Sequence, residues 1–527
     1  MALNLDSFHP DAVLATGPDA SREPVLRVDQ IQGNILPGFG TGWQRLFGLR
    51  IAPGAEGAMA ARAWLRMLAP RVTTLAQMQE VREVRRAVAR AAGVRPTLPD
   101  VLLNVALSFP ALEPLGLPTD RIRDTPFRQG MANTSLQDPV GSDGKPVGWR
   151  LGATPETTAH VLVILGSDSA EALNAAGEVL LGSLPPGMTC LYDETEERLP
   201  DSAEHFGFRD DISQPGVRGR LSDRPDHVLT RRYFDPADPR AEAFARPGQP
   251  LLWPGEFLFG YVAQQANGEL EPGAMAIPPH PWMQDGSFLI FRRLGQNVRA
   301  FRRFAEEQAP GISAQLGRPV SPAELQAWIV GRWPDGTPLS RSPGSPDAST
   351  AGDRMAVNFF DYVFEESDAQ VIEDGQARTV PGIPDDNRGL RCPHFAHIRK
   401  VNLRNKLTDQ GPSLSFRLLR RGIPYGPLHQ EGEPEGTERG LLFLAYQRRI
   451  DPPFLTLTST WMNAHDAPEG FGHDLLVGQN PGGRSAQRLN AQGQVIAELS
   501  SPAGEAWVIP TGGGFFFSPA KSVFETL

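Results

Sequence analysis

Residues 101–109 read Val-Leu-Leu-Asn-Val-Ala-Leu-Ser-Phe, a run in which every second position, from Val101 to Phe109, is apolar. Successive side chains of a β-strand point to opposite faces of the sheet, so these odd-numbered residues would share one face. The alternation therefore predicts a strand with one buried face. The fold class then depends on the elements that flank this strand.

The flanking sequence predicts an α+β unit. Apolar runs and helical spacing predict strands at 44–51, 160–165 and 187–192, and helices at 55–69 and 170–181. With the strand at 101–109, the order is strand-helix-strand followed by strand-helix-strand. That order is typical of a ferredoxin-like fold, in which helices cover one face of an antiparallel sheet.

The second half of the chain predicts a comparable alternation. Strand-like segments lie at 256–262, 287–291, 440–446 and 515–517, and helical patterns lie at 294–304, after Ser321 and at 453–463. Ser321-Pro-Ala-Glu324 is a capping box with proline at the first helical position. We therefore infer an internal duplication of structure, with two ferredoxin-like halves.

Composition changes along the chain predict its domain limits. Residues 1–27 are expected to form an extended arm, and 28–217 the N-terminal domain. Residues 218–255, rich in Arg, Asp and Pro, are expected to link it to a C-terminal domain at 256–527. Residues 333–379, with their Ser-, Pro- and Gly-rich tract, are expected to be an insertion in that domain.

The overall composition excludes several classes of protein. With 40% hydrophobic residues in 527, the chain can bury a large core. A net charge of −10 argues against binding to nucleic acid or to an anionic membrane surface, because both require a basic face. Two cysteines make no disulfide framework, and neither a signal peptide nor a membrane span is visible. The expected location is the cytoplasm.

The stretch that most suggests chemistry is Arg391-Cys-Pro-His-Phe-Ala-His-Ile-Arg-Lys400. Imidazole is a common ligand of haem iron, and nearby cations suit the carboxylates of a porphyrin. Zinc is a second interpretation, with Cys392, His394 and His397 as ligands, although a structural zinc site normally takes four. A purely structural role for these histidines is the third. The stretch alone leaves all three open.

Two turns carry further candidates. In Gly207-Phe-Arg-Asp-Asp-Ile-Ser-Gln-Pro215, Asp210 either caps the turn or faces a bound ligand. Arg420 precedes the rigid turn Gly422-Ile-Pro-Tyr-Gly426. A guanidinium fixed there would keep its charge and stabilise an oxygen anion.

Taken in order, these segments resemble the dye-decolorising peroxidases, most closely their longer forms. Matching motifs extend from about residue 29 to residue 519, in the same order. They are Gln32-Gly-Asn-Ile-Leu36, Gly207-Phe-Arg-Asp210, Glu256-Phe-Leu-Phe-Gly-Tyr261, His397-Ile-Arg-Lys400, Arg420-Arg-Gly-Ile-Pro-Tyr-Gly426, Gly440-Leu-Leu-Phe443, and Gly472-His-Asp474 with Gly478-Gln479.

The resemblance implies a haem peroxidase of the dimeric α+β barrel type, with haem b held mainly by the C-terminal half. It would reduce hydrogen peroxide and oxidise aromatic, dye-like donors in one-electron steps. Carried over motif by motif, the implied site consists of the iron ligand His397, the distal acid Asp210, the distal arginine Arg420, the apolar wall Leu441 and Phe443, the carboxylate Asp474 beside the proximal imidazole, and the propionate partner Arg399.

One departure from the family pattern motivates an alternative function. The family's turn reads Gly-x-x-Asp-Gly, whereas position 211 here is aspartate. Aspartate tolerates a positive φ less well than glycine, and Asp211 adds charge next to Asp210. The alternative is a haem-binding or haem-handling protein with little peroxidase turnover.

Overall fold

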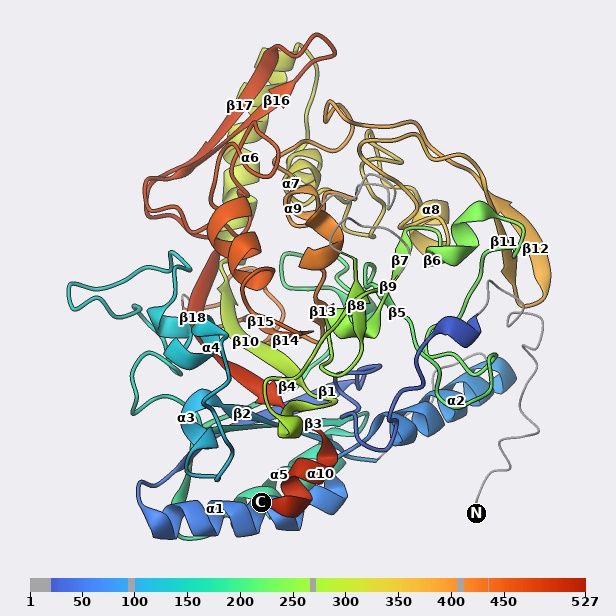
Figure 1. Cartoon of the computed structure of the whole chain (residues 1–527). Coiled ribbons are helices and arrows are strands. Elements are labelled where there is room, and N and C mark those ends of the chain that lie inside the picture. The colour runs from blue at the N-terminus through green and yellow to red at the C-terminus, as the bar shows by residue number, and fades with distance from the viewer. Residues whose placement is uncertain (1–19, 93–99, 266–271, 405–411, 435) are drawn as a thin grey trace.

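The structure is a computed structural model that describes residues 20–92, 100–265, 272–404, 412–434 and 436–527. Within them, one antiparallel sheet joins both halves of the chain (Figure 1). Its strands are β1 (Trp43–Ile51), β2 (Leu102–Ser108), β3 (Val161–Ser167), β4 (Met188–Glu197), β10 (Ser287–Gln296), β13 (Leu419–Arg420), β14 (Ile423–Tyr425), β15 (Gly440–Gln447) and β18 (Val508–Ser518). They lie in the order β13-β15-β10-β18-β2-β3-β1-β4, and β14 also pairs with β15.

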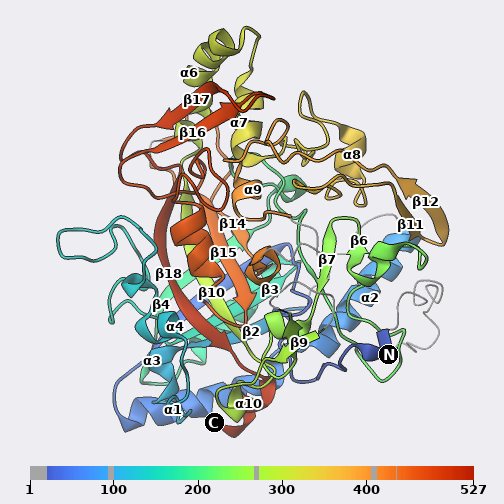
Figure 2. The same cartoon turned by 45° about the horizontal axis from the view of Figure 1, so that its top comes forward.

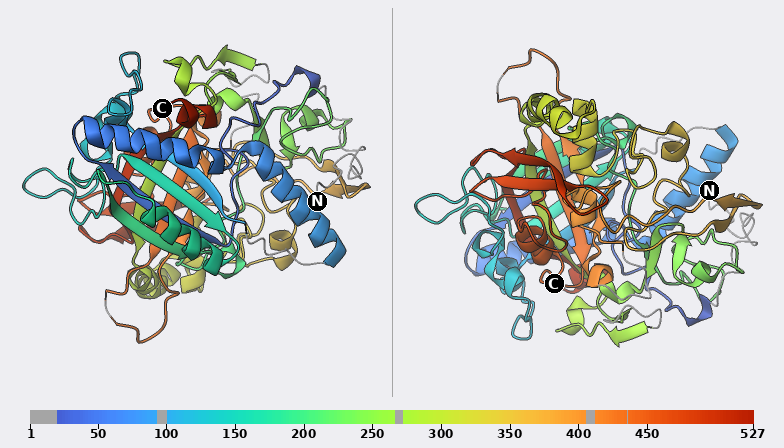
Figure 3. Two further views of the ribbon diagram at one scale, coloured as in Figure 1. Left: turned by 90° about the horizontal axis from the view of Figure 1, so that it is seen from below. Right: turned by 90° about the horizontal axis from the view of Figure 1, so that it is seen from above.

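The N-terminal half confirms the predicted ferredoxin-like unit. Its elements run β1, α1 (Ala55–Leu68), α2 (Leu75–Ala92) and β2, then β3, α5 (Ala170–Gly182) and β4. β1 pairs with both β3 and β4, so that the strand order in this half is β2-β3-β1-β4. α1 and α5 lie across one face of these strands, as the view from below shows (Figure 3, left).

The C-terminal half repeats the unit, as predicted. β10 leads into α6 (Val298–Leu316) and α7 (Pro322–Val330), and β15 and β18 pair on either side of β10. The serine half of the predicted capping box forms, because the Ser321 hydroxyl accepts a hydrogen bond from the backbone N–H of Glu324 (3.1 Å). The Glu324 carboxylate instead accepts a hydrogen bond from Arg318 (2.7 Å). β18 pairs with β2, Phe517 lying opposite Leu107. This pairing makes the two halves one sheet.

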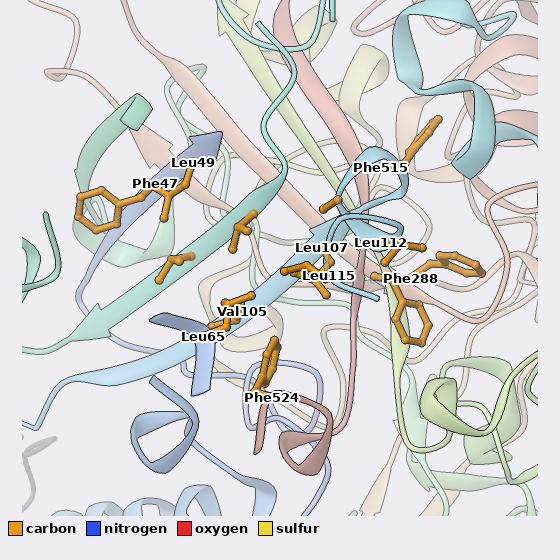
Figure 4. Packing of buried hydrophobic residues seen from close by; sticks show 14 of the residues in the cluster. Phe47, Leu49, Leu65, Val105, Leu107, Leu112, Leu115, Phe288, Phe515 and Phe524 are labelled. Atoms are coloured by element: carbon orange, nitrogen blue, oxygen red, sulfur yellow. The ribbon is translucent and has the colours of Figure 1, made fainter. Parts of the chain in front are cut away.

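β2 is buried on both faces, which corrects the prediction of one buried face. Its odd-numbered residues pack into an apolar cluster with α1, and Figure 4 shows Val105 near Leu65 and Phe524. Its even-numbered Leu102 and Ala106 belong to a second cluster, together with residues of the 26–39 segment and of β15. The second face is covered by segments far away in sequence, and the alternation within β2 cannot reveal them.

Several elements were not predicted. α2 was missed because most of its 18 residues are charged, polar or small, and Leu75 and Met78 are the buried apolar residues of its first turn. Four antiparallel pairs of consecutive strands were missed as well, one of them almost entirely inside the expected insertion. The elements not yet named are α3 (Phe109–Leu112), α4 (Thr125–Gln129), α8 (Ala348–Gly352), α10 (Lys521–Thr526), β5 (Gly216–Val217), β6 (Phe244–Arg246), β7 (Gln249–Leu252), β8 (Val262–Gln264), β9 (Pro272–Met275), and the hairpins β11 (Ala369–Glu373) with β12 (Gln376–Val380) and β16 (Arg484–Leu489) with β17 (Val495–Ser501).

One predicted strand is wrong, and one predicted helix differs in its hydrogen-bond pattern. Residues 256–262 do not form a strand, because Pro254 opens a 3-10 turn in which the backbone N–H of Phe257 donates to its carbonyl (3.0 Å). The helix predicted at 453–463 is present, with a π-helical pattern at Thr456–Trp461. In both segments most of the apolar side chains are buried.

The C-terminal end of the predicted arm is bonded to the predicted linker. Residues 1–19 lie outside the described residues, but the chain is anchored from Glu23 onward. The buried Glu23 carboxylate accepts hydrogen bonds from Arg218 (3.1 Å) and Arg232. The expected linker also contributes the small sheet β5-β7-β6, to the side of the main sheet (Figure 2). In the described part of the chain, each helix is too short or too polar to span a membrane.

Candidate active site

A cavity of about 940 Å³ lies against the strands of the C-terminal half. The wall that the main sheet forms carries residues of β10, β15 and β18. Most of the other lining residues also lie C-terminal to residue 255. The N-terminal half contributes the turn at 204–215, and the 235–250 segment contributes one side. The apolar lining includes Leu294, Val330, Phe360, Ile398, Leu418, Leu441, Phe443, Leu457, Met462, Leu476, Val477 and Val508.

His397 lies in the wall of this cavity, at the first residue of the short helix α9 (His397–Lys400). Its Nδ1 lies 2.7 Å from Asp474 Oδ2, whereas its Nε2 makes no hydrogen bond to the described residues. Burial acts to lower the pKa of His397, but the charge of Asp474 and the hydrogen bond to it outweigh burial and raise the pKa. The pair therefore leaves Nε2 as the ring nitrogen that can bind a metal.

Asp474 is fully buried and fixed by the chain that follows it. Its Oδ1 accepts hydrogen bonds from the backbone N–H groups of Leu476 (3.0 Å) and Val477 (3.1 Å). Because Oδ1 is occupied in this way, Oδ2 faces His397. Such a carboxylate orients a metal-binding imidazole and increases its basicity.

Asp210 and Arg420 line the same cavity as His397. Arg420 Nη2 donates to the Ser213 carbonyl (2.8 Å), which fixes the guanidinium beside the turn that carries Asp210. Arg420 Nη1 lies 4.0 Å from Asp210 Oδ1. The structure thus brings together the acid, the arginine and the histidine that the sequence selected.

Leu441 and Phe443 also line the cavity, both on β15. The intervening Leu442 and the following Leu444 are fully buried on the other face of the strand. Alternation along β15 therefore directs the two predicted wall residues toward the cavity.

Asp211 lies beside the cavity but does not line it. Its Oδ1 accepts a hydrogen bond from Arg209 Nε (3.2 Å), and both side chains are exposed. The residue with positive φ in this turn is Gly207 (φ 99°), and Asp211 is not among the positive-φ residues of the described chain. The backbone strain that motivated the low-turnover alternative is absent at this position.

Arg399 does not line the cavity, and the structure does not support its predicted role as a propionate partner. Its fully buried guanidinium donates to Glu469 Oε1 (3.0 Å) and to the backbone carbonyls of Asp386 (2.8 Å) and Cys392 (3.1 Å), and it stacks on Tyr362 (4.5 Å to the ring centre). Arg399 and His394 hold the pKa of Glu469 at about 2 although burial opposes this. The site proposed below therefore omits Arg399.

The zinc interpretation is contradicted. Across the described ranges, no group of three or more His, Cys, Asp or Glu side chains is arranged to hold a metal ion. Cys392 lies beside the Tyr362 hydroxyl (3.9 Å from Sγ to Oη), and His394 Nδ1 faces Glu469 Oε2 at 3.2 Å. Neither side chain joins His397 at the cavity.

The sequence missed a cationic end of the cavity, where Arg332, Arg404 and Arg417 line the wall. Arg332 and Arg404 both donate to Asn358, whereas Arg417 Nε is buried without a hydrogen-bond partner in the described residues. Burial and the neighbouring Arg404 lower the pKa of Arg417 to about 9. A buried guanidinium N–H without a hydrogen-bond partner indicates a place for an anion. The sequence does not group these residues, since Arg332 lies far before Arg404 and Arg417 in the chain.

Comparisons with known proteins agree with this architecture. The family described as "DyP dimeric alpha+beta barrel domain" matches residues 30–185, and "Dyp-type peroxidase, C-terminal" matches residues 263–473. The dye-decolorizing peroxidase msp1 of Mycetinis scorodonius is 30% identical over 453 residues, which cover 82% of this chain and 77% of that protein.

Solved structures are similar over nearly the whole chain. An ancestral D-type dye decolorizing peroxidase superposes with a TM-score of 0.73 at 31% identity, covering 95% of this chain and 99% of the other. A dye-decolorizing peroxidase in complex with 2,6-dimethoxyphenol gives a TM-score of 0.68 at 25% identity, with the same coverage of both chains. The predicted family is confirmed by these matches: the chain belongs to the dye-decolorizing peroxidases.

Proposed function

We propose that this peroxidase, which oxidises aromatic and dye-type donors, binds haem b through His397 and uses Asp210 and Arg420 on hydrogen peroxide. The observation that carries the proposal is the 2.7 Å pair of His397 and Asp474, which opens on the same cavity as Asp210 and Arg420. The proposed donors include small phenols, the class bound by the related enzyme in complex with 2,6-dimethoxyphenol.

The residues of the cavity fit a haem. Its volume of about 940 Å³ is in the range of about 300–1,000 Å³ typical of ligand pockets, and its walls are largely apolar. His397 Nε2 is available for iron. Arg417, whose Nε is an orphaned buried donor, would hold a propionate, and this role replaces the one predicted for Arg399.

The chain's own residues would act on the peroxide as a pair. The Asp210 carboxylate accepts a proton from one peroxide oxygen and returns it to the oxygen that leaves as water. The Arg420 guanidinium stabilises negative charge on that leaving oxygen. A bound haem would supply the redox chemistry, namely a two-electron reduction of peroxide balanced by one-electron oxidation of two donor molecules.

Haem reconstitution tests this proposal. Haem b titrated into the purified protein should give a Soret band at one haem per chain, and the loaded protein should oxidise 2,6-dimethoxyphenol only when hydrogen peroxide is added. A protein that binds no haem would contradict the whole assignment. A protein that binds haem but consumes no peroxide would restore the haem-handling alternative.

Asp474→Asn should weaken haem binding by about 10- to 100-fold, the usual effect of changing a partner of a metal ligand. The asparagine oxygen would remain hydrogen-bonded to the N–H groups of Leu476 and Val477, so its NH₂ group would face His397 Nδ1. That contact places the imidazole proton on Nε2, the nitrogen needed for iron. Haem titration followed by the Soret band measures the effect. Asp466→Asn, a change at an exposed acid, is the control, and equal affinities for both variants would contradict the role of Asp474.

Arg417→Met should weaken haem b binding by about 10- to 100-fold, because a hydrogen bond to a charged group contributes about 1.5–3 kcal/mol. The haem-free protein should unfold at the same or a higher urea concentration, since the change removes a buried N–H that has no hydrogen-bond partner in the described residues. Haem titration and urea unfolding measure these opposite effects, with the exposed Arg302→Met as control. Weaker folding with unchanged haem affinity would show that Arg417 is structural.

We propose the domain limits 28–217 and 256–527, with 218–255 between them and 333–379 as an insertion. A cytoplasmic location is supported by two free cysteines, as expected in a reducing compartment. Cell fractionation with peroxidase staining checks the location, and activity confined to the exported fraction would contradict it.

A further inference from the structure

Glu204 is a second carboxylate of the cavity wall, and the mechanism above gives it no part. It lies six residues before Asp210 in the sequence, and it lines the same cavity. Its side chain is only partly exposed. A carboxylate at this place can act on Asp210 through the backbone that joins them.

The two oxygens of Glu204 hold the backbone of the turn. Oε1 accepts a hydrogen bond from the N–H of Phe208 (2.9 Å), and Oε2 accepts one from the N–H of Phe206 (2.9 Å). Oε2 also accepts a hydrogen bond from the side-chain amide of Gln296, on β10. The carboxylate therefore holds the backbone of the turn in place and also connects the turn to the main sheet.

The same turn ends at Asp210. The backbone N–H of Glu204 donates to the Phe208 carbonyl (2.9 Å), and the N–H of Asp210 donates to the Ser202 carbonyl (3.0 Å). These two bonds close the loop between residues 202 and 210. The Glu204 side chain holds the middle of that loop. Loss of that side chain would free the loop and move the Asp210 carboxylate relative to Arg420.

We propose that Glu204 is a positioning residue for Asp210, and that its carboxylate and the Gln296 amide together hold the Asp210 turn on the sheet. The inference rests on the proposed role of Asp210 in the reaction with peroxide. Glu204 itself need not touch peroxide or haem.

The position of Glu204 also makes the turn sensitive to pH. Burial raises the pKa of Glu204 to about 7, although its three hydrogen-bond donors act to lower it. When protonated, Glu204 has an acceptor nearby, since Gln296 Oε1 is buried without a partner in the described residues and can turn toward it. The other titratable or charged groups facing the turn are Asp210 and Arg209 on the turn itself, Arg420 on β13, and His205, whose Nε2 contacts the Tyr425 carbonyl.

Glu204→Gln is the main test. Its amide cannot accept from both N–H groups, so the amides of Phe206 and Phe208 should exchange hydrogen for deuterium at least about 10-fold faster. The rate constant with hydrogen peroxide should fall about 10- to 100-fold, as expected when a catalytic group moves by about 1 Å. Haem affinity and the KM for 2,6-dimethoxyphenol should not change. The control is Asp201→Asn, which removes an exposed charge three residues earlier.

The pH dependence separates positioning from simple structural support. The folded-state pKa of about 7 lies above the ordinary 4.5, so ionising Glu204 destabilises the fold and stability is lost as pH rises from about 4.5 to about 7. Glu204→Gln should lack this loss in urea unfolding of the haem-free protein. The peroxide rate constant of Glu204→Gln should also lack the step near pH 7 that is expected for the unchanged protein.

Gln296→Leu keeps the test decisive if Glu204→Gln does not fold. It removes one donor to the ionised carboxylate, so the step in the peroxide rate should move to higher pH. Faster amide exchange with an unchanged peroxide rate would overturn the positioning role, as would a pH step that neither variant shifts. If Asp210→Asn also reacts normally with peroxide, the proposed function has failed instead.

Discussion

His397→Ala should abolish haem binding at concentrations that saturate the unchanged protein. Loss of the ligand itself must exceed the about 10- to 100-fold effect of losing a partner of that ligand. The described cavity wall contains no second histidine, because His394 is held against Glu469 and does not line it. The measurement is the Soret absorbance during a haem titration.

Two further variants make this result specific. His394→Ala changes the other histidine of the same segment and should keep the Soret band. His397→Gly leaves space beside Asp474, so added imidazole should restore the band. A full Soret band in His397→Ala, or its loss in His394→Ala alone, would move the iron ligand away from His397.

Asp210→Asn should retain haem and lose peroxide turnover. The side chain keeps its size but can no longer take up a proton, and a positioned acid–base group typically contributes about 10²–10⁴-fold. Stopped-flow mixing of the haem-loaded protein with hydrogen peroxide measures the second-order rate constant. The expected decrease lies in that range, with the Soret band before mixing unchanged.

The neighbouring aspartate provides the matched control for this variant. Asp211→Asn removes the same charge from an exposed side chain that pairs with Arg209 and does not line the cavity. Its rate should stay within about 2-fold of the unchanged protein, the range of surface effects of about 0.5 kcal/mol. A larger loss in Asp211→Asn than in Asp210→Asn would exchange the roles of the two residues.

The fold could be predicted where local patterns and element order agree. The elements around β2 gave the ferredoxin-like order directly, and Ser321 with Glu324 gave the start of α7. The prediction failed where distant segments decide the outcome. The second buried face of β2 depends on residues of the 26–39 segment and of β15, and α2 has too few apolar residues to mark a helix.

The candidate site shows the same division. Motifs located His397, Asp210 and Arg420, and the structure places them on one cavity. Arg399 does not line the cavity, because residues two apart on a helix point about 200° from each other and its guanidinium is directed toward Glu469. Arg417 and Glu204 carry no local signal, because burial and hydrogen bonds from other segments create their properties.

The pairing of β18 with β2 has a consequence for the order of assembly. β18 is the last strand of the described chain, yet it lies at the centre of the sheet and supplies Val508 to the cavity wall. During synthesis, β2 and β10 therefore each lack one neighbouring strand until β18 has been made. More than two hundred residues separate β10 from β18. We therefore expect cofactor binding to follow the synthesis of β18, since a chain cut before β18 would lack both the link between the two halves of the sheet and part of the pocket wall.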